Sequence, residues 1–297
     1  MTRGGMVSVP VQVASLASVL AAHDDYRIAR RIQPMVRCAA GFQRTDELLV
    51  CVLDCETTGT DHQTDKIIEL AVQRIYVSAD GRIAMTGKPR SWLEDPGVPL
   101  SPEICRITGL SDDDVKDQAI AEGEACCIIS SADVVLSHNA GFDRPFVEKR
   151  LGLPGLAWAC SLNDIDWREA GFEGRSLSQL LWQCGWFYEA HRASSDVNAL
   201  LHLLDHPLSA ATTVMKEVLE RARRPSWTIE AVGAPFSARG SLKARGYRWN
   251  PETRFWWKEV ADEVLQDELA WVAVQVYGGM ETPPHRQITW CERYAAR

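Results

Sequence analysis

Blocks of apolar residues separated by polar turns predict strands in the first part of the chain. The run from Leu48 to Leu53 is unbroken and apolar, which is typical of a buried strand. Two β-rich segments follow at 66–77 and 81–93, and the turn signal Ser78-Ala79-Asp80-Gly81 joins them. We therefore expect three neighbouring antiparallel strands.

Helices and short strands alternate after residue 101. Helix starts are expected near Ser101 and Ser111. Longer helices are predicted over 117–130, 142–151, 177–186, 194–204 and 207–224. Short buried strands are predicted over 132–137 and 156–160. This alternation indicates an α/β fold in which helices flank a mixed sheet.

The two ends of the chain differ from this central pattern. Residues 11–33 carry apolar residues at near-helical spacing, which predicts one or two short helices packed on the core. Pro225 follows a basic helix end and marks a domain boundary. Beyond it we expect a strand, a helix, a hairpin and a helix, at 227–232, 236–245, 247–258 and 262–274. The predicted divisions are an N-terminal helical extension (1–47), a main domain (48–224) and a small α+β domain (225–297).

Charge is distributed unevenly along the 297 residues, whose formal net charge is -8. Between Arg221 and Lys258 there are nine Lys and Arg residues against two Glu, a local net charge of +7. The remaining chain carries about -15. A nucleic-acid partner is compatible with this distribution, because basic side chains contact phosphates and acidic ones bind cations.

Nine cysteines, an odd number with no C-x-x-C pair, favour a reducing cytoplasm. The mildly apolar stretch 6–22 is interrupted by polar residues, so we do not expect a signal peptide. No run of eighteen apolar residues exists, and we expect no membrane association through a spanning helix.

Acidic residues follow the two buried strands of the main domain. Asp54 and Glu56 stand at i and i+2, so they share one side of the pleat and can share a divalent cation. Asp143 follows the strand at 132–137 and lies in the first turn of a helix, where α/β sheets collect ligands. His191 lies in a predicted loop, with Asp196 in the opening turn of the next helix.

These residue types suit phosphodiester hydrolysis. Carboxylates supply the hard oxygen ligands of Mg²⁺ or Mn²⁺, and imidazole titrates near neutrality. Two ions about 4 Å apart stabilise the attacking and leaving oxygens of an in-line displacement. We expect Asp54 to bridge both ions, Glu56 and Asp196 to complete the water-activating site, and Asp143 to support the second ion. His191 is the expected general base.

Each motif has a simpler interpretation when it is taken alone. A D-x-E pair is usually a solvated strand edge, Asp143 would cap its helix, and His191 would be a surface histidine. Their joint occurrence at strand exits and helix starts favours a catalytic site.

The three motifs resemble those of the DEDDh exonucleases, the family that contains the proofreading epsilon subunit of bacterial DNA polymerase III. The matching segments are Asp54-x-Glu56-Thr57-Thr58-Gly59, His138-Asn139-x-x-Phe142-Asp143 and His191-Arg192-Ala193-x-x-Asp196, within about residues 48–206. The resemblance implies a ribonuclease H-like fold with a five-stranded mixed sheet. It also implies stepwise 3′ to 5′ release of nucleoside 5′-monophosphates. Histidine at 191, rather than tyrosine, indicates the histidine branch.

The resemblance further implies that Glu56 and the backbone near Thr57 and Thr58 hold the terminal 3′ nucleotide. The candidate substrate-binding residues are Thr57, Thr58, Gly59, His138, Asn139 and Phe142. Two roles stay open for His138, namely contact with substrate and orientation of its loop. Asn139 is expected to tie the loop backbone together.

Six of the eleven tryptophans follow Pro225 and are mixed with basic residues. Two interpretations stay open: a platform for single-stranded nucleic acid, or the aromatic core of a small module. The candidate platform residues are Arg239, Lys243, Arg245, Arg248, Trp249, Arg254 and Trp256. The segment resembles a small domain appended to some bacterial epsilon-like exonucleases, and it departs from the polymerase-binding tail of a true epsilon subunit.

The predicted function is therefore a bacterial 3′ to 5′ exonuclease that acts on single-stranded 3′ ends, with DNA as the preferred substrate. DNA repair or replication proteins are possible partners. The first alternative is an exoribonuclease of the same superfamily, because sugar choice depends on pocket shape and 2′-hydroxyl contacts. The second is a non-catalytic adaptor that binds nucleic acid or a polymerase.

Overall fold

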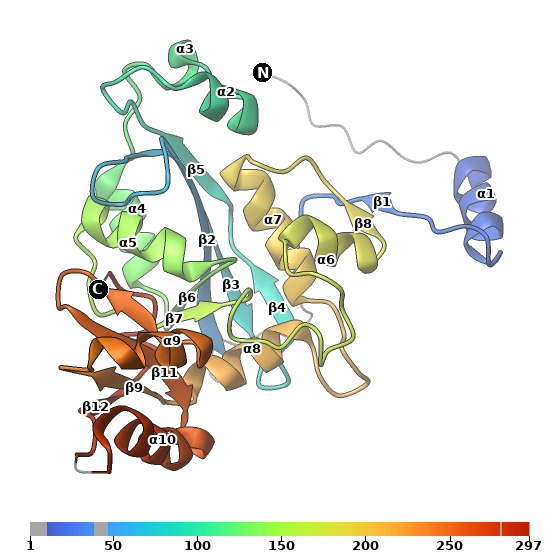
Figure 1. The fold of residues 1–297 in the computed structure, drawn as a ribbon. Helices are drawn as coiled ribbons and strands as arrows, with labels where there is room; N and C mark the ends of the chain where they lie inside the picture. Colours follow the sequence, from blue (N-terminus) through green and yellow to red (C-terminus); the bar gives the residue numbers. More distant parts are fainter. Residues whose placement is uncertain (1–10, 39–46, 280, 297) are drawn as a thin grey trace.

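A mixed β-sheet forms the centre of the molecule in the computed structural model, which describes residues 11–38, 47–279 and 281–296 (Figure 1). Its strands are β2 Leu48–Thr57, β3 Ile67–Val77, β4 Ile83–Thr86, β5 Arg90–Leu93, β6 Val134–Ser137 and β7 Trp158–Cys160. The order is β4-β3-β2-β6-β7, with β5 also paired to β3. Strands β3, β4 and β5 are antiparallel to their partners, whereas β2, β6 and β7 are parallel. This confirms the predicted ribonuclease H-like sheet of five strands and adds β5.

Helices cover both faces of this sheet, and they bury the apolar run of β2 on both sides. Val50 and Val52 pack in one core cluster with residues of α6, α7 and α8, while Cys51 and Leu53 pack in another with residues of α4 and α5. The bounds of these helices are α4 Glu122–Ser130, α5 Ala140–Leu151, α6 Leu177–Gln183, α7 Ala193–Leu204 and α8 Val214–Arg223. Two short helices, α2 Pro102–Thr108 and α3 Asp112–Val115, precede them. None of the helices in the described ranges is both long and apolar enough to cross a membrane.

Several predicted helix starts are displaced along the chain. The helix expected from residue 117 begins at Glu122, because Asp117 takes a left-handed conformation (φ 59°) and its N–H donates to Asp95. The helix expected from residue 207 begins at Val214, where the Thr213 side chain caps it by accepting from the Lys216 N–H. Helix α7 begins at Ala193, one residue before the predicted start.

The N-terminal segment packs differently from the prediction. Helix α1, Val11–Ala21, forms, but Leu16 and Val19 are 64% and 66% exposed, so its expected packing on the core is wrong. No second helix follows within residues 22–38. Instead β1, Arg30–Arg31, pairs in parallel with β8, Trp186–Phe187, and places Ile32 in the main core.

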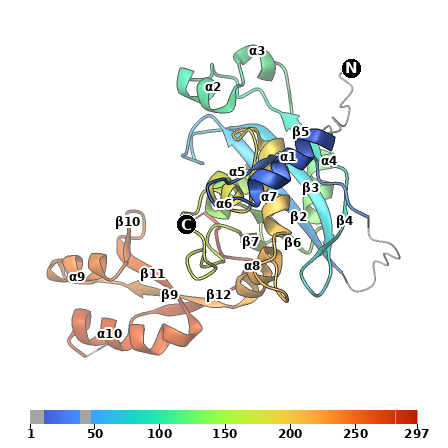
Figure 2. The ribbon, with the colours of Figure 1, turned by 90° about the vertical axis from the view of Figure 1, so that its right-hand side faces the viewer.

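The C-terminal module has its own antiparallel sheet in the order β10-β11-β9-β12. Its strands are β9 Ser226–Ala231, β10 Arg248–Asn250, β11 Phe255–Ala261 and β12 His285–Ile288. Helices α9, Arg239–Ala244, and α10, Leu265–Tyr277, pack with it in a separate core cluster. Figure 2 shows the module to one side of the main sheet, with α9 at its outer end. The boundary predicted at Pro225 falls between α8 and β9, and the domain division stays a prediction.

Residues 289–296 return to the main domain, which no sequence pattern predicts. The Arg144 guanidinium is nearly buried and donates to the carbonyls of Cys291 (2.7 Å) and Arg293 (2.6 Å). The Tyr294 hydroxyl donates to Asp164 at 2.6 Å. The backbone N–H of Trp158 donates to the Trp290 carbonyl at 3.0 Å. This tail therefore completes the packing around α5, the helix that carries Asp143.

Candidate active site

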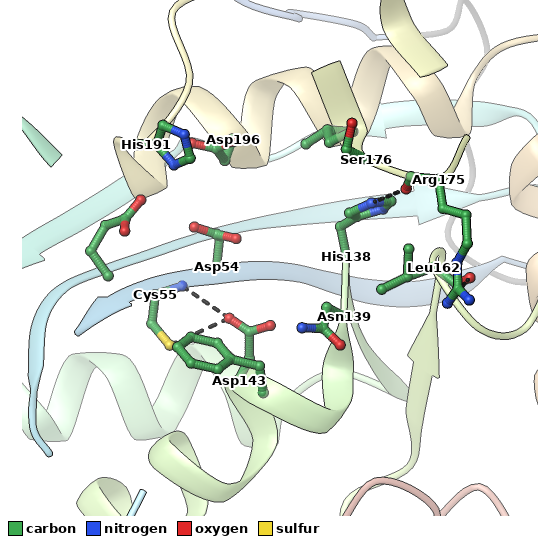
Figure 3. Close-up of a pocket in the computed structure, with 13 residues that line it drawn as sticks. Asp54, Cys55, His138, Asn139, Asp143, Leu162, Arg175, Ser176, His191 and Asp196 are labelled. Carbon is green, nitrogen blue, oxygen red and sulfur yellow. Dashed lines mark hydrogen bonds between the residues drawn. The ribbon is translucent and has the colours of Figure 1, made fainter. Parts of the chain in front are cut away.

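The five predicted catalytic residues meet in one pocket of about 510 Å³. Asp54 and Glu56 come from the end of β2, and Asp143 comes from the first turn of α5. His191 lies in the loop before α7, and Asp196 lies in the first turn of α7. Figure 3 shows Asp54 between Asp143 and Asp196, with His191 beside Asp196. The convergence follows from topology, because β2 and β6 are parallel and end at the same edge of the sheet.

Three of the acids are close enough to share one cation. Asp54, Glu56 and Asp196 each offer a carboxylate oxygen, and these oxygens all lie within 4.8 Å of one another. Asp143 lies outside this group and accepts from the Cys55 N–H at 3.1 Å and the Cys55 thiol at 3.3 Å. Carboxylate oxygens are the donors that hard divalent cations prefer, so the residues present fit such an ion.

The pKa values of the pocket carboxyls also fit a bound cation. Burial raises the pKa of Asp54 well above its usual range, and the charges of Asp143 and Asp196 raise it further. Burial, with the nearby charge of Asp196, raises the pKa of Glu56 to about 8. Burial also raises the pKa of Asp143 to about 7. Carboxyls that resist ionisation together are stabilised in their charged form when a cation lies between them.

His191 is exposed and takes a left-handed backbone conformation (φ 67°). That conformation is uncommon for a residue other than glycine and persists only where the surroundings impose it. On its C-terminal side, the Arg192 N–H donates to Asp196 at 3.1 Å. The imidazole is thus held at the pocket by the backbone of a fixed turn.

Glu69 fixes this turn, and the sequence analysis missed it. It lies in β3, is 1% exposed, and accepts from the Arg192 guanidinium at 2.9 Å and the Ala193 N–H at 3.2 Å. The available signal was a single carboxylate inside the apolar stretch 67–72, since a buried charge requires a partner.

Tyr188 is a second pocket neighbour that the sequence analysis missed. Its hydroxyl donates to Asp196 at 2.7 Å, so both oxygens of that carboxylate accept hydrogen bonds, one from Tyr188 and one from Arg192. Nothing in the sequence around Tyr188 identifies this contact.

His138 uses both of its ring nitrogens within the protein. Nε2 lies 2.9 Å from the Arg175 carbonyl, which can only accept, and Nδ1 lies 2.8 Å from the Ser161 hydroxyl. Burial lowers the pKa of His138 to about 4, so the ring is neutral at pH 7. These contacts tie His138 to the segment that carries Arg175, and both of its open roles stay predictions.

The remaining substrate-binding candidates divide into two groups. Asn139 and Phe142 line the pocket with His138. Thr57, Thr58 and Gly59 are not among its lining residues and instead form a turn, in which the Thr58 hydroxyl donates to Asp65 at 3.0 Å. A Cβ at Gly59 would collide with the Asp65 carboxylate, so a larger residue there would have to displace that side chain. Contact of either group with substrate stays a prediction.

A ribonuclease H-like sheet that gathers four carboxylates and a histidine in one pocket defines a DEDD-type nuclease domain. Residues 51–204, just over half of the chain, match the family model described as Exonuclease (RNase_T). The chain therefore belongs to this exonuclease family.

Curated relatives match parts of this chain. It is 34% identical over 191 residues to a PolC-type DNA polymerase III from Listeria innocua, a match that covers 63% of this chain and 11% of the relative. It is 29% identical over 113 residues to ribonuclease T from Shewanella baltica, a match that covers 34% of this chain and 51% of the relative. Among solved structures, E. coli exonuclease I with a dA16 oligonucleotide has a TM-score of 0.46 at 16% identity, covering 82% of this chain and 64% of that one. The chain thus spans only part of the length of these relatives.

Proposed function

We propose that this protein is a metal-dependent 3′ to 5′ exonuclease that releases nucleoside 5′-monophosphates from single-stranded ends. The observation that carries the proposal is the convergence of Asp54, Glu56, Asp143, His191 and Asp196 in one pocket. Membership of the exonuclease family supports it.

The proposed roles follow from the position of each side chain. Asp54, Glu56 and Asp196 would hold Mg²⁺ or Mn²⁺, and Asp143 would hold a second ion together with Asp54. The pair of ions supplies electrostatic stabilisation to the oxygens that attack and leave. His191 accepts a proton from the attacking water at a ring nitrogen, a role that imidazole fills near neutral pH. Asn139 and Phe142, together with the Thr57-Thr58-Gly59 turn, would position the terminal nucleotide.

DNA is the proposed substrate, and an exoribonuclease is the second candidate. The names of the relatives include both a DNA polymerase and a ribonuclease, so the family alone does not choose the sugar. A non-catalytic adaptor is disfavoured, because an adaptor has no need for clustered carboxylates whose burial raises their pKa. Nine free thiols support a reducing cytoplasm, where repair or replication proteins would be its partners.

Polarity, sugar and metal can be tested in one experiment. DNA and RNA oligonucleotides of one sequence, labelled at the 3′ or the 5′ end, are incubated with Mg²⁺, Mn²⁺ or a chelator. We expect the 3′ label to be released first as a mononucleotide from DNA, and no release with the chelator. Asp54→Asn should be inactive, whereas Asp113→Asn, the same change at an exposed carboxylate of α3, should match the wild type. Release from the 5′ end, or full activity of Asp54→Asn, would overturn the proposal.

A further inference from the structure

The C-terminal sheet is covered by its own helices on only one face. Ile229, Val260 and Trp256 share the core cluster with residues of α9 and α10. Side chains alternate between faces along a strand, so Trp257 lies on the opposite face. Arg248, its cross-strand partner, lies there too, and the guanidinium is 5.7 Å from the Trp257 ring. The edge strand β10 therefore carries a cation above an aromatic ring away from the helices.

Four basic residues around this edge are exposed and have no acidic partner. These residues are Arg239, Lys243, Arg248 and Arg254. No carboxylate within residues 11–38, 47–279 and 281–296 forms an ion pair with any of them. Arg245 and Lys258 differ, because both pair with the buried Glu268, at 3.2 and 3.1 Å. The basic residues of the module thus divide into two that have a structural partner and four that face solvent.

Two large aromatic rings of the module are also exposed. Phe236 is 85% exposed, and the Arg239 guanidinium lies 5.9 Å from its ring. Trp249 is 49% exposed and contacts the core residue Trp256 edge-on, with centroids 5.7 Å apart. Exposed rings combined with cations are the arrangement that single-strand binders use for stacking and ionic contact. Between residues 236 and 258, Glu252 is the only acidic residue.

We infer that this basic–aromatic surface binds a single strand of nucleic acid, with phosphates on the cations and bases stacked on the rings. The surface wraps around the β10 edge of the module. It is formed by Phe236, Arg239 and Lys243 from the segment that contains α9, by Arg248 and Trp249 from the two faces of the edge strand β10, and by Arg254 from the turn after it. Arg245 and Trp256, which the sequence suggested as members, are excluded because Glu268 neutralises the first and the core half-buries the second. The inference rests on the proposed function, since the strand bound here would be the substrate upstream of its 3′ end.

The choice of a single strand follows from the chemistry of the surface. Cations without acidic partners attract phosphates, and exposed rings can stack only on bases that are not already paired within a duplex. An acidic protein would satisfy the cations but would leave Phe236 and Trp249 without stacking partners.

Binding is tested apart from hydrolysis, in the Asp54→Asn background with a chelator. Fluorescence anisotropy of a labelled 20-nucleotide dT strand is measured between 50 and 300 mM salt. One variant changes Arg239, Lys243, Arg248 and Arg254 to Gln. Its control changes Arg27, Lys88, Arg106 and Lys116 to Gln, four exposed cations elsewhere, and so has the same net charge.

We expect the surface variant to lose at least tenfold in affinity at low salt and to flatten the slope of log K against log salt by about 0.7 for each lost phosphate contact. The control should keep both the affinity and the slope. Trp249→Ala should weaken binding by about tenfold with the slope unchanged, because stacking is not ionic.

Equal slopes for the surface variant and the control would overturn the inference. So would unchanged DNA binding by the surface variant combined with lost binding to polyaspartate, which would assign the surface to acidic proteins. Hydrolysis of a trinucleotide, which offers only two internucleotide phosphates for binding, separates this test from the proposed function. A surface variant that cleaves the trinucleotide at the wild-type rate keeps the nuclease assignment whatever the binding result.

Discussion

The active-site pocket and the basic–aromatic surface use charge in opposite environments. The pocket holds four carboxylates, of which Asp143 is buried and Asp54 half-buried, and desolvation raises the pKa of each. The surface holds four solvated cations on the module. Charges interact far more strongly at low dielectric, so single residues matter in the pocket, whereas on the surface the number of cations matters. A net charge of -8 is therefore compatible with the proposed binding of an anionic polymer, because four of the acids line a cation site and the module carries four exposed cations.

The largest effect of a single substitution in the pocket is expected at His191. His191→Gln should lower kcat by about 1,000-fold, since it removes the general base, and should leave the Kd for a long strand unchanged. Single-turnover hydrolysis and anisotropy measure the two quantities. His23→Gln, at an exposed position outside the pocket, should change neither. An unchanged kcat in His191→Gln would remove the histidine from the chemistry.

A pair of arginines tests the contrast between buried and solvated charge. Arg144→Ala should lower the free energy of unfolding by about 3 kcal/mol, because it leaves the carbonyls of Cys291 and Arg293 without donors and Glu148 without its partner. Arg248→Ala should change it by less than about 0.5 kcal/mol. Urea unfolding of both variants gives the values. Similar losses would contradict the contrast.

The pH dependence of stability tests the pocket itself. The folded-state pKa of Glu56 is raised to about 8 and that of Asp143 to about 7, so their contribution is present below about pH 4 and is lost as the pH rises through those values. Without metal, the free energy of unfolding should fall by about 2 kcal/mol between pH 5 and 8 relative to Glu56→Gln. Mg²⁺ should reverse the loss at pH 8. Thermal melts with chelator or Mg²⁺ measure this, and identical pH profiles for both proteins would contradict it.

The smallest effect is expected at Arg192, whose side chain is 44% exposed. Arg192→Ala leaves Glu69 buried without its ion-pair partner and should lower stability by about 1 kcal/mol after allowance for solvent screening. It should also lower kcat with KM unchanged, because the turn at His191 is loosened. Arg90→Ala, which breaks an exposed pair with Glu124, should affect neither. A change in KM alone would place Arg192 in substrate binding.

The sequence predicted what local patterns determine. The apolar run before Asp54 and the helix starts around Asp143 and Asp196 fixed where each acid stands, and parallel strands then bring these positions together. Contacts between distant segments were not predictable. Glu69 meets Ala193 across 124 positions, and Arg144 meets Cys291 across 147. An arginine that binds carbonyls in the interior has the same local sequence pattern as one that faces solvent.

The tail that accepts from Arg144 also determines when the exonuclease domain is complete during synthesis. Domains generally fold as they leave the ribosome, starting from the N-terminal side. Here the carbonyls that pair with Arg144 are translated about 147 residues after it. Helix α5, and with it Asp143, reaches its final packing only after the module has emerged, so the growing polypeptide carries the catalytic carboxylates for some time before their support is in place.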